Sequence, residues 1–569
     1  MPATKPRPYS GLFVTSGVKQ TTARSSAPVS RLGATAANSL SEVGKGRGES
    51  ARPYFRKRAV MPIPPDNRNP EEIAAVALHP ALQGHMHSPG IVACPNGDLL
   101  LTYFSGLASN LEYLPSVIFT IQRLRHGAQE WDWPEYFYSA QDVIEESPGM
   151  LHNNGAIWHI TGGVSMHGVP FKWIESTDNG ATWGQTRFPV LEGPLGAYDA
   201  QPINSHWRGA DGTLYVTTDA RGGSSALWAS TDGGKTWRDT GGRTHGRHTT
   251  FAELADGRIL GMGGKTSEYE GFMPRSLTAD GGKTWEKLKT HFSPGAFNQR
   301  PSLLRLKSGR LFFACDAQPN RGASPMKERG TLVALSDDNG ETWHIKTLAA
   351  AQIHDAHAHG KDTGKESGWH SAPEHHENTL GYSVATQSPD GVIHLVTSTN
   401  HPCLHFEMNE AWILEKDNQP QSPAPTAVGV SEKHVERHLN GNPRVTWSDA
   451  SDSRGGLLLH GIETWHYEDG TPQYEVRYVS GLKTGTETYC YPSGKVKWTK
   501  EWQPAKGGTH PTGLTSTDRT MVWTQYWSNG NVKAQSRWRN NVAEGPAELW
   551  SPEGDLSASV AFRDGAASV

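Results

Sequence analysis

The sequence predicts an all-β protein in which a β-propeller is followed by a smaller sheet of stacked hairpins. Three observations support this fold class. The 569 residues include 62 Gly, 20 Trp and 16 Tyr, whereas hydrophobic residues make up only 35%. One turn motif occurs four times, and a different hairpin motif recurs towards the C-terminus. Long helical periodicity is absent, so many short strands joined by turns are expected.

The first repeat is an eight-residue turn motif that reads Ser/Thr-x-Asp-x-Gly-x-Thr-Trp. Its four copies occupy residues 176–183, 230–237, 278–285 and 336–343. Successive copies are about 50 residues apart, which is the length of one four-stranded propeller blade. The motif therefore predicts four consecutive blades.

Each copy has the chemistry of a hairpin turn. Its carboxylate can accept backbone N–H groups across the turn, its glycine adopts a positive φ without steric cost, and its Trp buries a large ring against the blade. Because the turn needs the carboxylate, we expect the four acidic residues to be structural rather than catalytic. They are Asp178, Asp232, Asp280 and Asp338.

A second repeat, in which a polar turn and a glycine precede an apolar strand, sets the number of blades. Its six copies contain Gly97, Gly155, Gly212, Gly257, Gly309 and Gly391. Six units predict six blades, and a seventh blade built from residues around 60–85 and 405–450 is the alternative. The eight-residue motif resembles the Asp-box (BNR) repeat of the sialidase family, and this resemblance implies a six-bladed sialidase-like propeller.

The C-terminal repeats have a different pattern, in which an aromatic-rich strand leads into a turn that ends in glycine. These glycines are Gly470, Gly494, Gly530 and Gly554. The units resemble MORN-type hairpins, which stack into an extended sheet and depend on their neighbours for burial. Their aromatic side chains are candidates for binding a protein or glycan partner, although packing within the sheet is the simpler explanation.

These patterns divide the chain into four parts. We expect a leader over 1–60 that is disordered or mistranslated, a sialidase-like propeller over 61–415, a proline-containing linker over 416–455 and a MORN-like domain over 456–569. The two repeat regions are expected to bury separate surfaces, so the propeller should fold without the tail.

Composition excludes several classes of protein. The net charge of −4 argues against non-specific binding of nucleic acid, and no apolar run approaches the roughly 20 residues that span a membrane. The four cysteines include no CxxC pair, which makes a zinc ribbon improbable.

Two candidate catalytic residues follow from the sialidase resemblance. His87, in His-Ser-Pro, stands where sialidases carry the Arg of an Arg-Ile-Pro motif that binds the substrate carboxylate; an imidazole suits proton transfer better. Tyr382, in Tyr-Ser before an Asp-Gly turn, matches the place of the sialidase nucleophile. The Glu that pairs with this Tyr in sialidases has no clear counterpart, and Glu253 and Glu377 are the nearest candidates.

Three arginines are candidates for binding an anionic substrate, because a guanidinium forms bidentate hydrogen bonds with a carboxylate. They are Arg247, Arg275 and Arg300. Arg247 and Arg300 each precede the apolar strand of consecutive blades, which places them where propeller loops converge. Salt bridges between blades are the structural alternative for each of them.

A histidine-rich region was also considered as a metal site. It contains His354, His357, His359, His370, His375, His376, His401 and His405. Histidines can bind metal, but the spacing matches no recognisable ligand pattern. We therefore assign neither a metal nor another cofactor.

Three functions are compatible with these residues. The first is a glycoside hydrolase that cleaves a glycosidic bond at an acidic sugar, with Tyr382 as nucleophile and Arg247 and Arg300 holding the sugar. The second is a polysaccharide lyase acting on a uronate-containing glycan, with His87, Tyr382 and Arg300 as base, acid and carboxylate neutraliser. The third is a non-catalytic propeller that binds a glycan or a protein. An acidic oligosaccharide or polysaccharide is the expected partner.

Overall fold

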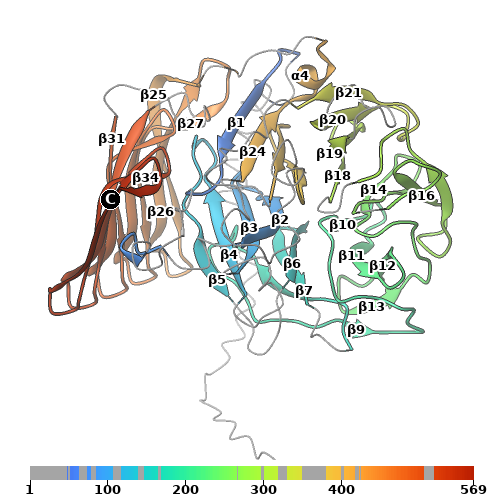
Figure 1. Cartoon of the computed structure of the whole chain (residues 1–569), viewed down its shortest axis with the longest axis horizontal. Coiled ribbons are helices and arrows are strands. Elements are labelled where there is room, and N and C mark those ends of the chain that lie inside the picture. The colour runs from blue at the N-terminus through green and yellow to red at the C-terminus, as the bar shows by residue number, and fades with distance from the viewer. Residues whose placement is uncertain are drawn as a thin grey trace, which may run out of the picture.

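The computed structural model describes residues 48, 51–62, 74–78, 85–106, 117–138, 146–163, 168–265, 267–295, 300–317, 330–348, 380–398, 403–416, 422, 424–504 and 518–568 (Figure 1). Strands dominate this part of the chain, and a short helix, α4 (Glu410–Leu414), follows the last propeller strand. No helix in these ranges is long and apolar enough to cross a membrane.

Six sheets form the blades of the propeller. The first blade contains β2 (His85–Ala93), β3 (Leu99–Gly106), β4 (Ile118–Leu124) and β5 (Glu135–Tyr138), and the second contains β6 (Glu146–Asn153), β7 (Ala156–Gly162) and β8 (Lys172–Ser176). The third contains β10 (Trp207–Arg208), β11 (Leu214–Ala220), β12 (Ser224–Ser230) and β13 (Thr236–Asp239), with β9 (Val190–Leu191) beside β13. The fourth blade contains β14 (Thr250–Glu253), β15 (Ile259–Met262), β16 (Pro274–Thr278) and β17 (Glu286–Lys289). The fifth contains β18 (Ser302–Arg305), β19 (Leu311–Ala317), β20 (Gly330–Ser336) and β21 (His344–Thr347). The predicted six-bladed propeller is confirmed, and the seven-bladed alternative is wrong.

The sixth blade closes the ring with a strand from the N-terminal region. It contains β22 (Val384–Gln387), β23 (Ile393–Val396) and β24 (Leu404–Met408), and β1 (Phe55–Ala59) pairs with β24 as its outermost strand. The Phe55 ring stacks on Trp412 with centroids 4.2 Å apart. We expected all of residues 1–60 to lie outside the fold, and this is wrong for residues 55–59, because the edge of β24 and an apolar cluster hold them in place.

The four Asp-box turns lie on four successive blades, each directly after the third strand of its sheet: β8, β12, β16 and β20. In the second copy the Asp232 carboxylate accepts hydrogen bonds from Thr236 N at 3.0 Å and Thr236 Oγ1 at 2.8 Å, and Ser230 Oγ accepts one from Gly234 N at 2.8 Å. The same bond from the Thr amide to the Asp carboxylate occurs in the other three copies, at 2.8–3.0 Å. The acidic side chains are therefore occupied by their own turns.

The C-terminal region forms a single 12-stranded sheet. Its strands are β25 (Ala427–Arg437), β26 (Pro443–Asp452), β27 (Leu457–Leu459), β28 (Gly461–His466), β29 (Pro472–Val479), β30 (Leu482–Cys490), β31 (Val496–Pro504), β32 (Arg519–Tyr526), β33 (Val532–Arg539), β34 (Val542–Trp550), β35 (Leu556–Arg563) and β36 (Ala566–Ser568). In Figure 1 this sheet, coloured orange to red, stands beside the propeller.

The sheet begins earlier than the sequence predicted. We expected a linker over 416–455, but β25 and β26 already belong to the sheet. Val445 and Trp447 on β26 are buried in the same apolar cluster as Val476 and Tyr478 on β29. This burial extends the folded sheet into the predicted linker.

The propeller and the C-terminal sheet share an apolar interface. Ala75, Val76 and Leu78 of the N-terminal region pack in one cluster with Met521 and Trp538. Trp133, which follows β4, lies against that cluster. The ring centroids of Trp133 and Trp538 are 4.9 Å apart, and the Trp133 indole N–H donates to Asn541 Oδ1 at 3.2 Å. The expectation that the two regions bury separate surfaces is therefore wrong.

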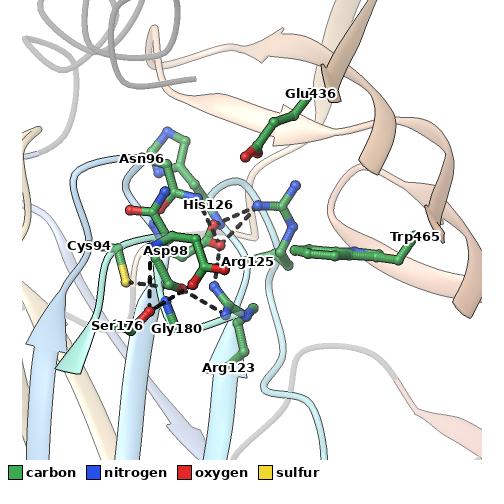
Figure 2. A network of polar contacts seen from close by, with 12 residues as sticks. Cys94, Asn96, Asp98, Arg123, Arg125, His126, Ser176, Gly180, Glu436 and Trp465 are labelled. Carbon is green, nitrogen blue, oxygen red and sulfur yellow. Dashed lines mark hydrogen bonds and ion pairs between the residues drawn. The ribbon is translucent and has the colours of Figure 1, made fainter. Parts of the chain in front are cut away.

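A buried ionic network crosses the same junction (Figure 2). The Asp98 carboxylate, fully buried in the first blade, accepts hydrogen bonds from Arg123 Nη1 at 2.7 Å, from Arg125 Nη1 at 2.9 Å and from the His126 amide at 2.8 Å. Arg125 Nε also donates to Glu463 on β28 at 3.0 Å. Burial alone would raise the pKa of Asp98, but the two guanidinium groups lower it to about 2.

Candidate active site

Residues at the start of several blades converge at the centre of the propeller. Arg300, just before β18, and Tyr382, just before β22, form a short parallel bridge: Arg300 N donates to Gly381 O at 3.2 Å, and Ser383 N donates to Arg300 O at 3.0 Å. The first strands of these blades also contact each other. Tyr382 and Arg300 are almost fully buried, with 3% and 1% of their surfaces exposed.

The hydroxyl of Tyr382 is the end of a buried polar chain. His248 Nε2 lies 2.9 Å from the Tyr382 hydroxyl, and His248 Nδ1 lies 2.8 Å from Asp219 Oδ2 on β11. His248 Nδ1 is close to Asp219 without forming a hydrogen bond of standard geometry. A neighbouring carboxylate favours the tautomer with the proton on Nδ1, and in that tautomer Nε2 accepts the Tyr382 proton. This is the arrangement in which a base, itself oriented by a carboxylate, activates a hydroxyl group.

The surroundings of the polar chain keep His248 neutral and Asp219 ionised, which are the states needed for proton transfer. Burial lowers the pKa of His248 to about 3, against the raising effect of Asp219, so its ring is neutral near pH 7. Burial alone would raise the pKa of Asp219, but His248 and the Arg247 guanidinium hold it below its usual range. A neutral imidazole beside an ionised carboxylate can accept a proton and be stabilised once it has done so.

Cations and a second imidazole surround the Tyr382 ring. The Arg300 guanidinium carbon lies 4.6 Å from the ring centroid, and Lys265 Nζ lies 5.8 Å from it. The ring of His87, on β2, is 4.1 Å from the same ring, centroid to centroid. Positive charge at these distances favours the phenolate form of tyrosine over the phenol.

Backbone strain occurs at both histidine positions. His248 has a φ of 54°, and Ser88, next to His87, has a φ of 46°. The pairing of β2 with β3 also shifts register between His87 and Gly90. Residues other than glycine rarely adopt such angles, and where they do the site is often functional. A β-bulge of this kind redirects a side chain.

The structure brings together four of the five predicted site residues. Arg247 joins His87, Arg300 and Tyr382, because its Nε donates to Asp219 Oδ2 at 2.8 Å. The side chain of Arg247 is 39% exposed and therefore reaches solvent. Arg275 is elsewhere: its guanidinium pairs with Glu341 of the fourth Asp-box turn at 2.6 Å. This contact is the salt bridge between blades that was considered as the alternative for each arginine.

Comparison with known proteins agrees with this architecture. The profile of the BNR repeat-like domain family matches residues 97–395, more than half of the chain. The chain belongs to this family. The profile of the MORN repeat variant matches residues 459–480. No curated protein sequence matches the chain.

Several solved structures are similar to this BNR-family chain. A protein of unknown function from Dyadobacter fermentans shares 16% identity, with 63% of this chain and 99% of that chain covered and a TM-score of 0.43. A Hadza microbial sialidase shares 16% identity over 57% of this chain and 65% of that one, with a TM-score of 0.42. The Trypanosoma rangeli sialidase shares 12% identity over 84% and 89%, with a TM-score of 0.40.

Sequence reasoning missed Asp219 and His248. The sequence analysis considered only a glutamate as the partner of Tyr382, whereas among the described residues an imidazole, His248, lies 2.9 Å from its hydroxyl. Of the two glutamates considered, Glu253 accepts a hydrogen bond from Ala210 N at 3.1 Å, and Glu377 lies outside the described residues. The available signal was local, because His248 directly follows Arg247, which was already a candidate.

One buried group has the residue types of a metal site. His394, His405 and Glu407 place their ligand atoms within 4.8 Å of one another. However, Trp131 Nε1 donates to His405 Nδ1 at 3.1 Å, so His405 Nε2 carries the proton that His394 Nδ1 accepts at 2.9 Å. Glu407 pairs with Arg58 at 2.6 Å. Hydrogen bonds and an ion pair thus account for these three groups. Of the histidine-rich region considered in the sequence analysis, only His405 is among the described residues.

Proposed function

We propose that the protein is a glycan-active enzyme that cleaves a glycosidic bond at an acidic sugar, with Tyr382 as the reacting group. The observation that carries this proposal is the chain of contacts from Asp219 through His248 to the Tyr382 hydroxyl. A phenol held in this way by a neutral imidazole is prepared to lose its proton. A tyrosine that served only as packing would not require it.

In the hydrolase mechanism, Tyr382 acts as the nucleophile. His248 accepts the phenol proton, and the phenolate oxygen attacks the anomeric carbon as the bond to the leaving oxygen breaks. The imidazolium, stabilised by Asp219, returns its proton to the leaving oxygen, and water then cleaves the glycosyl–tyrosine bond. Arg300 and Lys265 stabilise the phenolate, and the exposed part of Arg247 is suited to bind the sugar carboxylate.

A lyase mechanism is the second candidate, and the two imidazoles that contact Tyr382, those of His248 and His87, favour it. In this mechanism a base, either His87 or the Tyr382 phenolate, removes the proton next to a uronate carboxylate. The electron pair then forms a C=C bond, the glycosidic oxygen departs, and an acid protonates it. His87 and Tyr382 lie close enough to share these two roles, with ring centroids 4.1 Å apart.

A panel of sialylated and uronate-containing glycans tests the proposal. Release of free sialic acid supports the hydrolase, whereas new ultraviolet absorbance from an unsaturated uronate supports the lyase. Tyr382→Phe should abolish turnover, and Tyr136→Phe, which alters an exposed tyrosine, should leave it unchanged. If no glycan is cleaved but some are bound, the binding-module hypothesis replaces both mechanisms.

A further inference from the structure

A second site is formed where the propeller meets the C-terminal sheet. A cavity there is lined by three parts of the chain: the edge strand β1, the connection after β4, and strands β30–β33 with the turn that follows them. Its lining residues are Arg56, Lys57, Arg58, Ala59, Gln129, Glu130, Leu482, Trp502, Arg519, Met521, Trp538, Asn540 and Asn541. None of these residues belongs to the site around Tyr382.

Cationic residues outnumber anionic ones in this lining. Four of its residues are cationic, namely Arg56, Lys57, Arg58 and Arg519, and one, Glu130, is anionic. Arg519 Nη1 pairs with Glu130 at 2.8 Å, which neutralises that carboxylate. Arg58 pairs in the same way with Glu407, which lies outside the lining, at 2.6 Å, and Arg56 Nη1 donates a hydrogen bond to Gln129 Oε1 at 2.8 Å. Cations gathered around a partly dehydrated space favour an anion within it.

Arg58 gives independent evidence for a missing acceptor. Its side chain is 8% exposed, and its Nη2 pairs with Glu407 at 2.6 Å. Its Nη1 is buried and has no hydrogen-bond partner among the described residues. A buried charged donor left without an acceptor is costly, and an oxyanion in the cavity that Arg58 lines would satisfy it.

The rest of the lining defines what else the ligand can carry. Trp502 and Trp538 provide aromatic walls, and Arg519 lies over the Trp502 ring at 4.6 Å. The Asn540 and Asn541 amides add polar groups at one side. We propose that this cavity binds a small oxyanion, that is, a carboxylate, sulfate or phosphate group, either free or on a compact organic body.

Because the lining comes from both halves of the molecule, the bound anion should also strengthen the junction. A ligand that binds only the folded protein raises its stability in proportion to the logarithm of its concentration. This consequence does not depend on the chemistry at Tyr382.

Titration calorimetry of the full chain with inorganic phosphate, sulfate and glucuronate tests the proposal, with chloride matching the ionic strength. We expect saturable binding of at least one probe and a melting temperature that rises with its concentration. Binding of phosphate or sulfate identifies a free inorganic anion as sufficient, whereas binding of glucuronate alone identifies a carboxylate on a sugar-sized body.

Arg56→Gln should weaken that binding about tenfold, because a charge-assisted hydrogen bond to the anion is lost. Arg437→Gln, on the exposed part of β25, is the matched control and should bind as wild type does. Tyr382→Phe should also bind the anion normally, which separates this site from the proposed enzyme site. The proposal is overturned if wild type binds none of the three probes saturably, or if Arg56→Gln binds as tightly as wild type.

Discussion

The centre of the propeller and its junction with the C-terminal sheet both bury charged side chains, but they arrange them differently. At the junction, Asp98 is surrounded by donors, and Arg125 bridges it to Glu463. At the centre, the chain from Asp219 through His248 ends at the hydroxyl of Tyr382. The junction network pairs carboxylates with guanidinium groups, whereas the central chain links a carboxylate through a neutral imidazole to a hydroxyl group that can react.

This difference shows why burial of charge is not by itself evidence of function. The Asp98 network has a perturbed pKa and complete burial, yet its contacts explain it as a device that holds two parts of the molecule together. The central cluster adds backbone strain at His248 and Ser88 and a neutral imidazole on a phenol. These additional features, rather than burial, distinguish a candidate reaction centre.

Removal of the C-terminal sheet should have the largest effect. A chain ending at Pro425 would expose Trp133 and residues 75–78, and would leave Arg125 without Glu463. We expect this chain to be insoluble or to lack a cooperative melting transition, because apolar surface and a buried charge lose their partners. A soluble, cooperatively folding chain of this length would show that the shared interface contributes little.

Asp98→Ala should be the most damaging single substitution at the junction. It leaves the buried Arg125 and the partly buried Arg123 without their shared carboxylate, and breaking a buried ion pair typically costs about 3–5 kcal/mol. Urea unfolding measures this loss, and Asp256→Ala, which breaks a surface pair with Arg258, is the control with little expected effect. Equal stability of the two variants would contradict the structural role of the network.

At the centre, the same kind of change should act on reactivity more than on stability. His248→Gln should lower turnover of the cleaved glycan by at least about 100-fold, since the general base is lost, while the amide keeps some hydrogen-bonding capacity. The expected loss of stability is only about 1–3 kcal/mol, the cost of an imperfect buried hydrogen bond. Turnover near that of wild type in a folded His248→Gln protein would exclude this residue from the chemistry.

The two regions also differ in what the sequence could predict. The blades and box turns follow from local chemistry, because each Asp, Gly and Trp acts within its own hairpin. His87, Arg247, Arg300 and Tyr382 were identifiable from their places near blade strands. The polar chain from Asp219 to Tyr382 was not, since it joins Asp219 on β11 to residues of two other blades and includes His248, whose φ of 54° no sequence pattern indicates.

Docking of the C-terminal sheet was equally beyond sequence reasoning. The contact of Arg125 with Glu463 joins residues 338 positions apart, and no repeat pattern encodes which face of the hairpins meets the propeller. The predicted domain boundaries were wrong at residues 55–59 and 427–452 for the same reason, since pairing with other strands places these residues in the fold.

Acid should destabilise the protein in two phases. Burial lowers the pKa of His206 and His248 to about 3, below about 6.5 in the unfolded chain, so unfolding takes up protons as the pH falls below 6.5. Stability should therefore decline from pH 6.5 downwards. The pKa of Asp98, lowered to about 2, adds a loss only below about pH 4. Melting curves from pH 7.5 to 3 measure both phases.

The control for this pH dependence is the His248→Gln protein. It should lose stability less steeply between pH 6.5 and 4 than wild type, because one proton fewer is taken up on unfolding. An Asp98→Asn protein should keep the wild-type slope in that range. Identical slopes for wild type and His248→Gln would show that this histidine is not held neutral in the folded state.

The smallest expected effects concern the Asp-box turns, which are not equivalent. Asp232 serves only its own exposed hairpin, so Asp232→Ala should lower the melting temperature slightly and leave turnover unchanged. Asp178 serves the same kind of turn but also faces the C-terminal sheet, because Arg444 Nη1 lies 3.5 Å from its carboxylate and Arg444 Nη2 donates to its carbonyl oxygen at 3.1 Å. Asp178→Ala should therefore lower the melting temperature more than Asp232→Ala does, and the difference should disappear when both are made in an Arg444→Met background. If the two substitutions have equal effects in the wild-type chain, the second-blade box takes no part in holding the C-terminal sheet.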